Sequence, residues 1–185
     1  ESWAKRGQAL RMLGRHEEAL TAFDLSVRLN PHYAWAWNGR GLVFKELGQH
    51  EETLECYINA AKEDPQVIWY TINQIDILLE LQRRQEALIA IDLAIDTHPL
   101  HSIAWARRGQ ILRRLHRYEE AIDSYSRAVE LSPRYAWAWN GKGLCLSTLG
   151  QWGKAMVCYK KALEYEPKDI WFWHNKNLSV KSVLL

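Results

Sequence analysis

The sequence predicts an all-α fold in which pairs of helices repeat along the chain as an α-solenoid. One observation is a proline that returns at a constant step of 34 residues. The prolines are Pro31, Pro65, Pro99, Pro133 and Pro167. Another is a tryptophan that opens most units, with a glycine four residues later, as in Trp37 and Gly41. A 34-residue period is typical of stacked helix–turn–helix units.

Each unit is predicted to contain two amphipathic helices. Leu10, Leu20 and Phe23 belong to an apolar stripe with steps of three and four residues. Glycines such as Gly48 separate the helices, because helix ends favour a left-handed residue, and the proline cannot continue the second helix. First helices are expected at 2–14, 35–47, 68–81, 102–115, 136–149 and 170–184. Second helices are expected at 17–30, 51–64, 85–98, 119–132 and 153–166.

The repeated residues resemble those of the tetratricopeptide repeat family. An aromatic and a small residue mark the first helix, and an alanine, an aromatic and another small residue mark the second. In the fifth unit these are Trp139, Gly143, Ala155, Tyr159 and Ala162. The match covers essentially the whole chain, and arrays so rich in tryptophan look bacterial, cyanobacterial in particular. The resemblance implies a right-handed superhelix of antiparallel helix pairs whose first helices line a concave face.

One continuous array is expected over residues 1–185. Its predicted units are 1–33, 34–67, 68–101, 102–135, 136–169 and a half repeat or capping helix at 170–185. The third unit is degenerate: Thr71 replaces the tryptophan, Ile75 a glycine and Gln82 the turn glycine. We expect a locally altered pitch at 68–98, which either reflects tolerated drift or shapes a pocket.

A longer period of 102 residues overlies the first. Residues 33–39 and 135–141 share the sequence Tyr-Ala-Trp-Ala-Trp-Asn-Gly. The same shift pairs Ile68 and Trp69 with Ile170 and Trp171. A block of three repeats has therefore been duplicated, and its surface should occur twice.

Composition restricts the class of partner. The chain has 24 basic and 22 acidic residues and a net charge of +2, so no strong field attracts nucleic acid or an acidic membrane. Cys56, Cys145 and Cys158 lack the spacing of metal ligands and cannot all pair, which favours a reducing, cytoplasmic compartment. No apolar run is long enough to span a membrane, and the start does not resemble a signal peptide.

The two ends predict a fragment of a longer array or a multidomain protein. The chain starts without methionine at the edge of a unit, and it stops after one helix of a sixth unit. A terminal capping helix should have a polar outer face, whereas this helix carries Trp171, Phe172, Leu184 and Leu185. Self-association through these unfinished ends is one expected interaction.

The resemblance places the second residue of each unit on the concave face. From the second unit onward these residues are Trp35, Trp69, Ile103, Trp137 and Trp171. The repeat's own core tryptophan stands two residues later, so the additional ones are predicted anchors for a partner. The alternative is that they pack against the preceding second helix and stiffen the stack.

Amide and basic side chains are predicted beside the tryptophans. The amides are Asn38, Asn73, Asn140 and Asn175. Because an amide both donates and accepts hydrogen bonds, it can hold the backbone of an extended or helical peptide. Arg107, Gln110 and Arg114 add positive charge, so the set suits a peptide with apolar anchors and acidic flanks. Ordinary solvated charge remains the alternative reading of the arginines.

Several other sites are not supported by their context. The clamp by which some members of the family bind chaperone tails is missing, since Ala4 and Gln8 stand at its first positions. The Asn-Gly-Arg-Gly segment at 38–41 resembles a phosphate loop but lies inside a predicted helix and follows no strand. His98 and His101 have no neighbouring residues to complete a metal site. We predict no enzymatic activity, no cofactor and no metal.

Three functions remain open at this point. The first is a protein-interaction scaffold or adaptor that binds a peptide or partner helix in the concave groove. The second is a sensor or substrate-docking arm of a larger multidomain enzyme or signalling protein. The third is binding of single-stranded nucleic acid by tryptophan stacking, which the near-neutral net charge disfavours.

Overall fold

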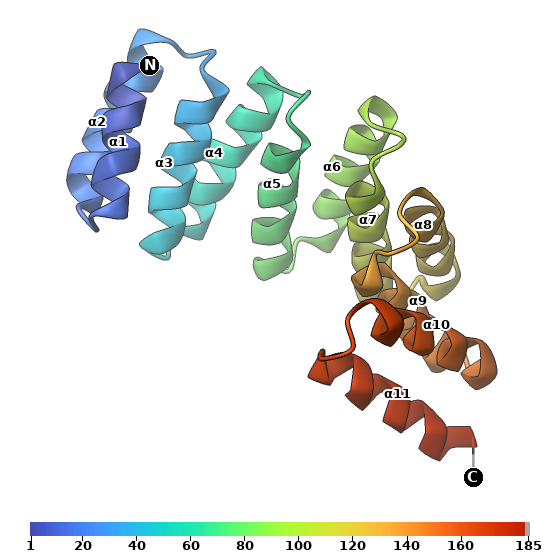
Figure 1. Cartoon of the computed structure of the whole chain (residues 1–185). Coiled ribbons are helices and arrows are strands. Elements are labelled where there is room, and N and C mark those ends of the chain that lie inside the picture. Colours follow the sequence, from blue (N-terminus) through green and yellow to red (C-terminus); the bar gives the residue numbers. More distant parts are fainter. Residues whose placement is uncertain (184–185) are drawn as a thin grey trace. The chain divides into compact units, whose positions relative to one another are not determined.

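The computed structural model describes the backbone of residues 1–183 and the side chains of residues 1–178. Over these residues the chain consists of α-helices joined by short turns, which confirms the all-α prediction (Figure 1). The helices are α1 (Ser2–Met12), α2 (His16–Leu29), α3 (Ala34–Glu46), α4 (His50–Glu63), α5 (Ile68–Glu80), α6 (Arg84–Thr97), α7 (Ser102–Arg114), α8 (Tyr118–Leu131), α9 (Ala136–Thr148), α10 (Trp152–Tyr165) and α11 (Ile170–Val183). The predicted ends of the helices agree with the observed ones within one or two residues. The predicted end of the last helix at residue 184 lies outside the described part of the chain. The same holds for Leu184 and Leu185, which were predicted to belong to its apolar face.

The chain comprises two compact units, residues 1–90 and 91–185, with the boundary inside α6. Unit 1 contains α1 to α5, and unit 2 contains α7 to α11. Within each unit a first helix packs on its own second helix, and first helices of neighbouring repeats also meet: α1 with α3, α7 with α9, and α9 with α11. This helix-pair packing is the local geometry of an α-solenoid. The division into six repeats of one continuous array stays a prediction.

The turn inside each helix pair has the same hydrogen bonds in all five pairs. After α3, the amide of Gly48 donates to the carbonyl of Lys45 at 3.1 Å, and the amide of Gln49 donates to that of Phe44 at 2.9 Å. This is the Schellman ending of a helix, which requires a left-handed residue. Gly48 adopts φ +73°, whereas Gln82 and His116 adopt φ +61° at the equivalent positions without the freedom of glycine.

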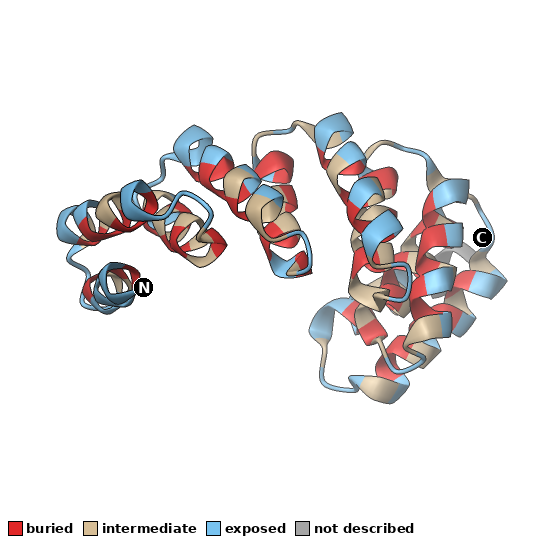
Figure 2. Cartoon of the chain, turned by 90° about the horizontal axis from the view of Figure 1, so that it is seen from above, coloured by how far each residue is buried: buried red, intermediate tan, exposed pale blue. Residues whose placement is uncertain are grey.

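The core of the first and fourth repeats is an aromatic side chain held between two first helices. Phe23 lies against Gly7 of α1 and Gly39 of α3, and Tyr125 of α8 packs in the same way on Gly109 and Gly141. Both aromatic residues are fully buried or nearly so. Figure 2 shows the buried residues as stripes along the helices, with exposed turns between them. The two glycines allow the backbones to approach the ring because neither has a side chain.

The core tryptophans fix the start of α3, α7, α9 and α11. The indole Nε1–H of Trp37 donates to the carbonyl oxygen of Pro31 at 2.8 Å. The same bond joins Trp105 to Pro99, Trp139 to Pro133 and Trp173 to Pro167. The 34-residue spacing of tryptophan and proline thus reflects a repeated contact between the inter-repeat turn and the first helix. Thr71 stands at the corresponding position of the third repeat and cannot make this indole bond.

Ile75 of the third repeat is fully buried at the position where four other repeats have glycine. Its side chain therefore adds to the core and does not project into solvent. The altered pitch expected at 68–98 stays a prediction.

Candidate functional site

In unit 1, α3 and α5 carry the predicted site residues on one face. The Nδ2 of Asn73 donates to the Oδ1 of Asn38 at 2.9 Å and so links the two helices. Trp35 stands three residues before Asn38 and Trp69 four before Asn73, which places each tryptophan on the same helical face as its asparagine. We call this surface the first-helix face of unit 1.

The two tryptophans of this face differ in exposure. Trp35 is half-buried, packs against the core cluster around Phe23, and lies 6.0 Å from Tyr33 between ring centroids. These contacts are those of the alternative in which the tryptophan packs against the preceding second helix. Trp69 is 54% exposed, which is unusual for so large an apolar side chain and is what a partner anchor requires.

In unit 2, α7, α9 and α11 form the corresponding first-helix face. The Nδ2 of Asn175 donates to the Oδ1 of Asn140 at 2.9 Å, the same bond as in unit 1. Asn140 is only 8% exposed, so Asn175 is the member of the pair that a partner can reach. Trp171 is 74% exposed and lies 6.3 Å from His174 in an edge-on arrangement.

Trp137 is the centre of an aromatic and cationic cluster in unit 2. Its ring lies 6.1 Å from both Tyr125 and Tyr135, and the guanidinium of Arg107 stands 5.8 Å above it. Arg107 also donates to Gln110 at 3.0 Å on the same helix. Burial raises the pKa of Tyr135, while the positive charge of Arg107 acts in the opposite direction. A half-buried tryptophan and its arginine therefore form the floor of this face.

Arg114 completes the predicted set. It lies exposed at the end of α7, one helical turn beyond Gln110. The structure thus gathers Trp137, Asn140, Trp171, Asn175 and the three α7 residues in unit 2, and Trp35, Asn38, Trp69 and Asn73 in unit 1. The predicted role of these residues in binding stays a prediction.

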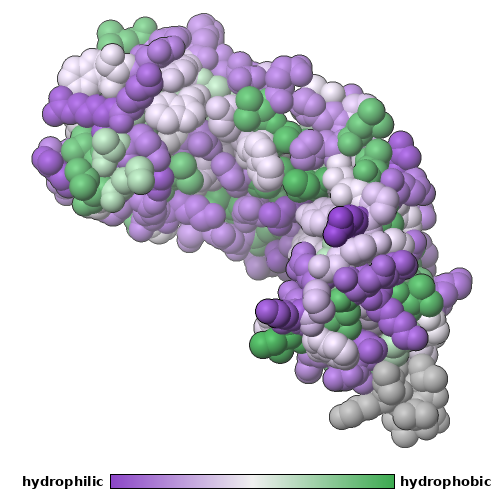
Figure 3. All heavy atoms as spheres, viewed as in Figure 1, coloured by the Kyte–Doolittle hydropathy of each residue, from purple (hydrophilic) through white to green (hydrophobic). Residues whose placement is uncertain are grey.

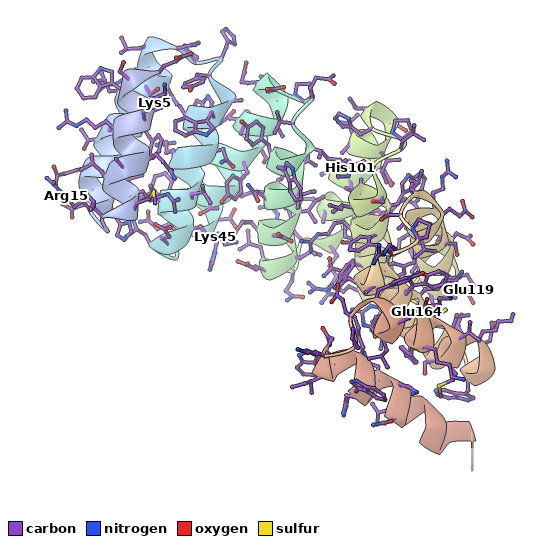
Figure 4. All side chains as sticks on the ribbon, in the orientation of Figure 1. Lys5, Arg15, Lys45, His101, Glu119 and Glu164 are labelled. Carbon is purple, nitrogen blue, oxygen red and sulfur yellow. The ribbon has the colours of Figure 1, made fainter. Side chains whose placement is uncertain are left out.

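The charge of the first helices differs between the units. In unit 2 the sequences of α7, α9 and α11 contain no aspartate or glutamate. Most acidic side chains of this unit lie on second helices, among them Glu119 on α8 and Glu164 on α10 (Figure 4), while Glu166 and Asp169 lie in the turn before α11. In unit 1, Glu46 and Glu80 end α3 and α5. Glu46 pairs with Arg11 and lies 3.5 Å from His16, and Glu80 lies 3.9 Å from Lys45. The first-helix face of unit 2 is therefore the more positive of the two.

Figure 3 shows hydrophilic side chains interspersed with small hydrophobic patches on the side seen in Figure 1. Sequence reasoning missed two features of the site. The asparagines pair with each other, so only part of their hydrogen-bonding capacity is left for a ligand. Tyr33 and Tyr135 support the inner tryptophans, and the identity of the segments at 33–39 and 135–141 was the signal that could have found them.

A separate cavity of about 550 Å³ lies between α8, α9 and α10. Leu146 and Lys142 line it, where unit 1 has Phe44 and Arg40, with the Arg40 guanidinium 4.9 Å above the Phe44 ring. None of the predicted site residues lines this cavity, so it is distinct from the first-helix face.

Models of tetratricopeptide repeats match residues 7–48, 36–67 and 101–165, which together make up more than half of the chain. The chain belongs to the tetratricopeptide repeat family. The repeated contacts between proline and tryptophan and between aromatic residue and glycine are thus its form of the tetratricopeptide core. A search of curated proteins finds no match.

Solved tetratricopeptide structures share the fold. YrrB, described as a TPR protein with an unusual peptide-binding site, aligns over 95% of this chain and 90% of its own at 20% identity, with a TM-score of 0.77. MamA from Desulfovibrio magneticus RS-1 gives 18% identity and a TM-score of 0.76, covering 91% of this chain and 95% of its own. TTC0263, a thermophilic TPR protein of Thermus thermophilus, covers 100% and 98% at 22% identity, with a TM-score of 0.68. At these identities the likeness concerns the fold alone.

The described residues also bear on metal binding and membrane insertion. Among them no group of three or more histidine, cysteine or acidic side chains is placed to hold a metal ion. No helix in the described part of the chain is both long and apolar enough to cross a membrane.

Burial raises the pKa of Cys56 to about 11 and that of Cys145 to about 12, so both thiols stay protonated near neutral pH.

Proposed function

We propose that this tetratricopeptide array is a protein-interaction scaffold that binds a peptide or partner helix on its first helices, the face that the family resemblance makes concave. The observation that carries the proposal is the composition of this face in unit 2. It combines an exposed Trp171, the amide of Asn175 and the arginines of α7, and its helices contain no carboxylate. Protein interaction is also the role for which stacked repeats of this class are suited.

Each group on the face suits a different part of a peptide. The indole of Trp171 offers a large apolar surface to a leucine or aromatic side chain. Asn175 uses one N–H toward Asn140 and keeps a second N–H and its carbonyl oxygen for a main-chain amide. Arg114 is exposed and suits a carboxylate. The ligand class is thus a peptide with an apolar centre and acidic flanks.

Single-stranded nucleic acid is the alternative ligand, since exposed tryptophan and arginine also stack on and neutralise it. Acidic side chains on the second helices and a chain net charge of only +2 disfavour it. A role as sensor or docking arm within a larger enzyme or signalling protein uses the same face and differs in what is attached.

The test is binding of an array of peptides in which acidic residues flank one varied central side chain. The wild type is expected to prefer leucine and aromatic centres. Trp171→Ala is expected to weaken binding about tenfold or more, because truncating a central aromatic anchor typically costs about 2 kcal/mol. Arg114→Glu is expected to weaken acidic peptides specifically.

The matched controls lie on second helices. Ile89→Ala removes an apolar side chain of α6 that is 63% exposed, and Arg127→Glu reverses a charge on α8. Both should leave peptide binding unchanged. Equal affinity of the wild type and Trp171→Ala would contradict the proposal, and retention of single-stranded DNA with loss in moderate salt would favour the nucleic-acid alternative.

A further inference from the structure

We propose that the chain carries two corresponding peptide sites, one on each first-helix face, and binds two copies of the same peptide, more tightly in unit 2. The inference rests on the proposed function and adds the number of peptides bound per chain and the order of affinity of the two sites. Its basis is that the duplicated block reproduces a set of contacts as well as a stretch of sequence.

The amide contacts of the two faces match. Asn73 donates to Asn38 and Asn175 donates to Asn140, both at 2.9 Å. The members of each pair stand 35 residues apart, on consecutive first helices. In each face the asparagine of the later helix therefore donates to the asparagine of the preceding first helix in the same way.

The aromatic distances match as well, with the rings inclined by 41° in unit 1 and by 27° in unit 2. Tyr33 and Trp35 have ring centroids 6.0 Å apart, and Tyr135 and Trp137 have theirs 6.1 Å apart. Behind them, Gly39 is backed by Phe23 and Gly141 by Tyr125. On the following helix, Trp69 and Trp171 are the exposed members. The inner tryptophan is thus structural and the outer one exposed in both units, so a ligand that fits one face fits the other.

The charges around the two faces do not match. Glu46 and Asp76 of unit 1 correspond to Thr148 and Leu178 of unit 2. The carboxylates of unit 1 also lie close to cations: Glu46 pairs with Arg11, and Glu80 lies 3.9 Å from Lys45. In unit 2 the guanidinium of Arg107 lies over Trp137 and its helix carries no carboxylate. An acidic peptide should therefore bind unit 2 more strongly, and its binding there should depend more on salt.

The experiment counts peptides per chain by native mass spectrometry and titrates them by calorimetry. The probe is the peptide Glu-Asp-Glu-Leu-Phe-Glu-Asp-Glu, which has an apolar centre and acidic flanks, and the protein is the full chain. The wild type should bind two copies, with affinities about tenfold apart, a ratio that corresponds to about 1.4 kcal/mol.

Two matched variants separate the sites. Trp69→Ala should keep one tight, salt-sensitive site, and Trp171→Ala should keep one weak site that responds less to salt. Because both indoles are largely exposed, circular dichroism should show unchanged helix content. Thr148→Glu, which introduces the unit 1 carboxylate into unit 2, should reduce the affinity ratio to about threefold or less while two copies still bind.

The outcomes distinguish the two proposals. Absence of any binding overturns both. A single copy on the wild type, with Trp69→Ala indistinguishable from it, overturns the two-site proposal and leaves the function on unit 2 intact. Two copies whose tighter member is lost in Trp69→Ala overturn the ranking of the units.

Discussion

Single atoms decide how closely the repeats stack. A methyl group added to Gly141 would lie 2.5 Å from the Cζ of Tyr125, and one added to Gly39 would lie 2.4 Å from Phe23. Real carbon atoms do not approach so closely, so the ring or the helix would have to move. The glycine that looks like a weak point in a helix is here the residue that admits the neighbouring aromatic side chain.

We predict that Gly141→Ala destabilises the chain by about 1 to 3 kcal/mol, the usual range for overpacking in a core. Gly153→Ala is the control, because Gly153 lies in α10 and has no neighbouring atom within 4 Å of an added methyl group. That substitution should stabilise by about 0.5 to 1 kcal/mol through helix propensity. Chemical denaturation of both variants measures the difference, and equal effects in the two would contradict this packing role.

At the scale of the element, the helix-ending turns form with or without glycine. Gln82 and His116 make the same pair of backbone hydrogen bonds as the glycines do, at φ +61°. The penalty of a side chain in the left-handed region is local, of order 1 kcal/mol, and the packing of the flanking helices outweighs it.

We predict that Gln82→Gly raises the free energy of unfolding by about 0.5 to 1 kcal/mol. Relief of the left-handed strain favours the variant, and the greater freedom of glycine in the unfolded chain offsets part of the gain. Gly48→Gln is the reverse substitution at the equivalent turn, where an added methyl group meets nothing within 4 Å, so it should destabilise for conformational reasons alone. Thermal unfolding of both variants tests the pair, and a shift of the same sign in both would refute it.

The elements were predictable from the sequence because their signals are local. Proline at the inter-repeat turn, glycine after the first helix and a three-to-four apolar step set the helix bounds to within two residues. The site was less predictable, because its contacts join residues about 34 positions apart. The placement of Arg107 over Trp137 and the pairing of Asn73 with Asn38 depend on how neighbouring repeats stack, and periodicity gives only the order of the repeats.

For the molecule as a whole, buried thiol and phenol groups make the free energy of unfolding depend on pH in the alkaline range. Cys56 and Tyr57 lie in unit 1 and Cys145 in unit 2, and burial raises the pKa of Tyr57 to about 12 and that of the two thiols to about 11 and 12. In an unfolded chain a thiol ionises near pH 8.5 and a tyrosine near pH 10. Above these values the unfolded state loses protons first, so stability falls as pH rises toward the folded pKa.

We predict that the free energy of unfolding is nearly constant from pH 7 to 8 and falls above pH 9. Cys56 should contribute about 2 kcal/mol of the loss at pH 10, since one pKa unit corresponds to about 1.4 kcal/mol. Urea titrations of the wild type and Cys56→Ala at pH 8 and pH 10 measure it. The variant should lose less stability between the two pH values, and an identical loss in both proteins would exclude the thiol as a cause.

The duplicated Tyr-Ala-Trp-Ala-Trp-Asn-Gly segment also bears on how the chain assembles. During folding, Gly39 of the copy at 33–39 can pack against its own ring, Phe23, or against Tyr125, which packs on the equivalent Gly141 of the other copy and has almost the same shape. The ring from the wrong block lies across a roughly fivefold longer loop, and closing that loop costs about 1.5 kcal/mol more entropy. The shorter loop therefore favours packing of each copy on the ring nearest to it in the sequence. At high concentration the same ring of a second chain competes, because a contact between two chains requires no loop closure.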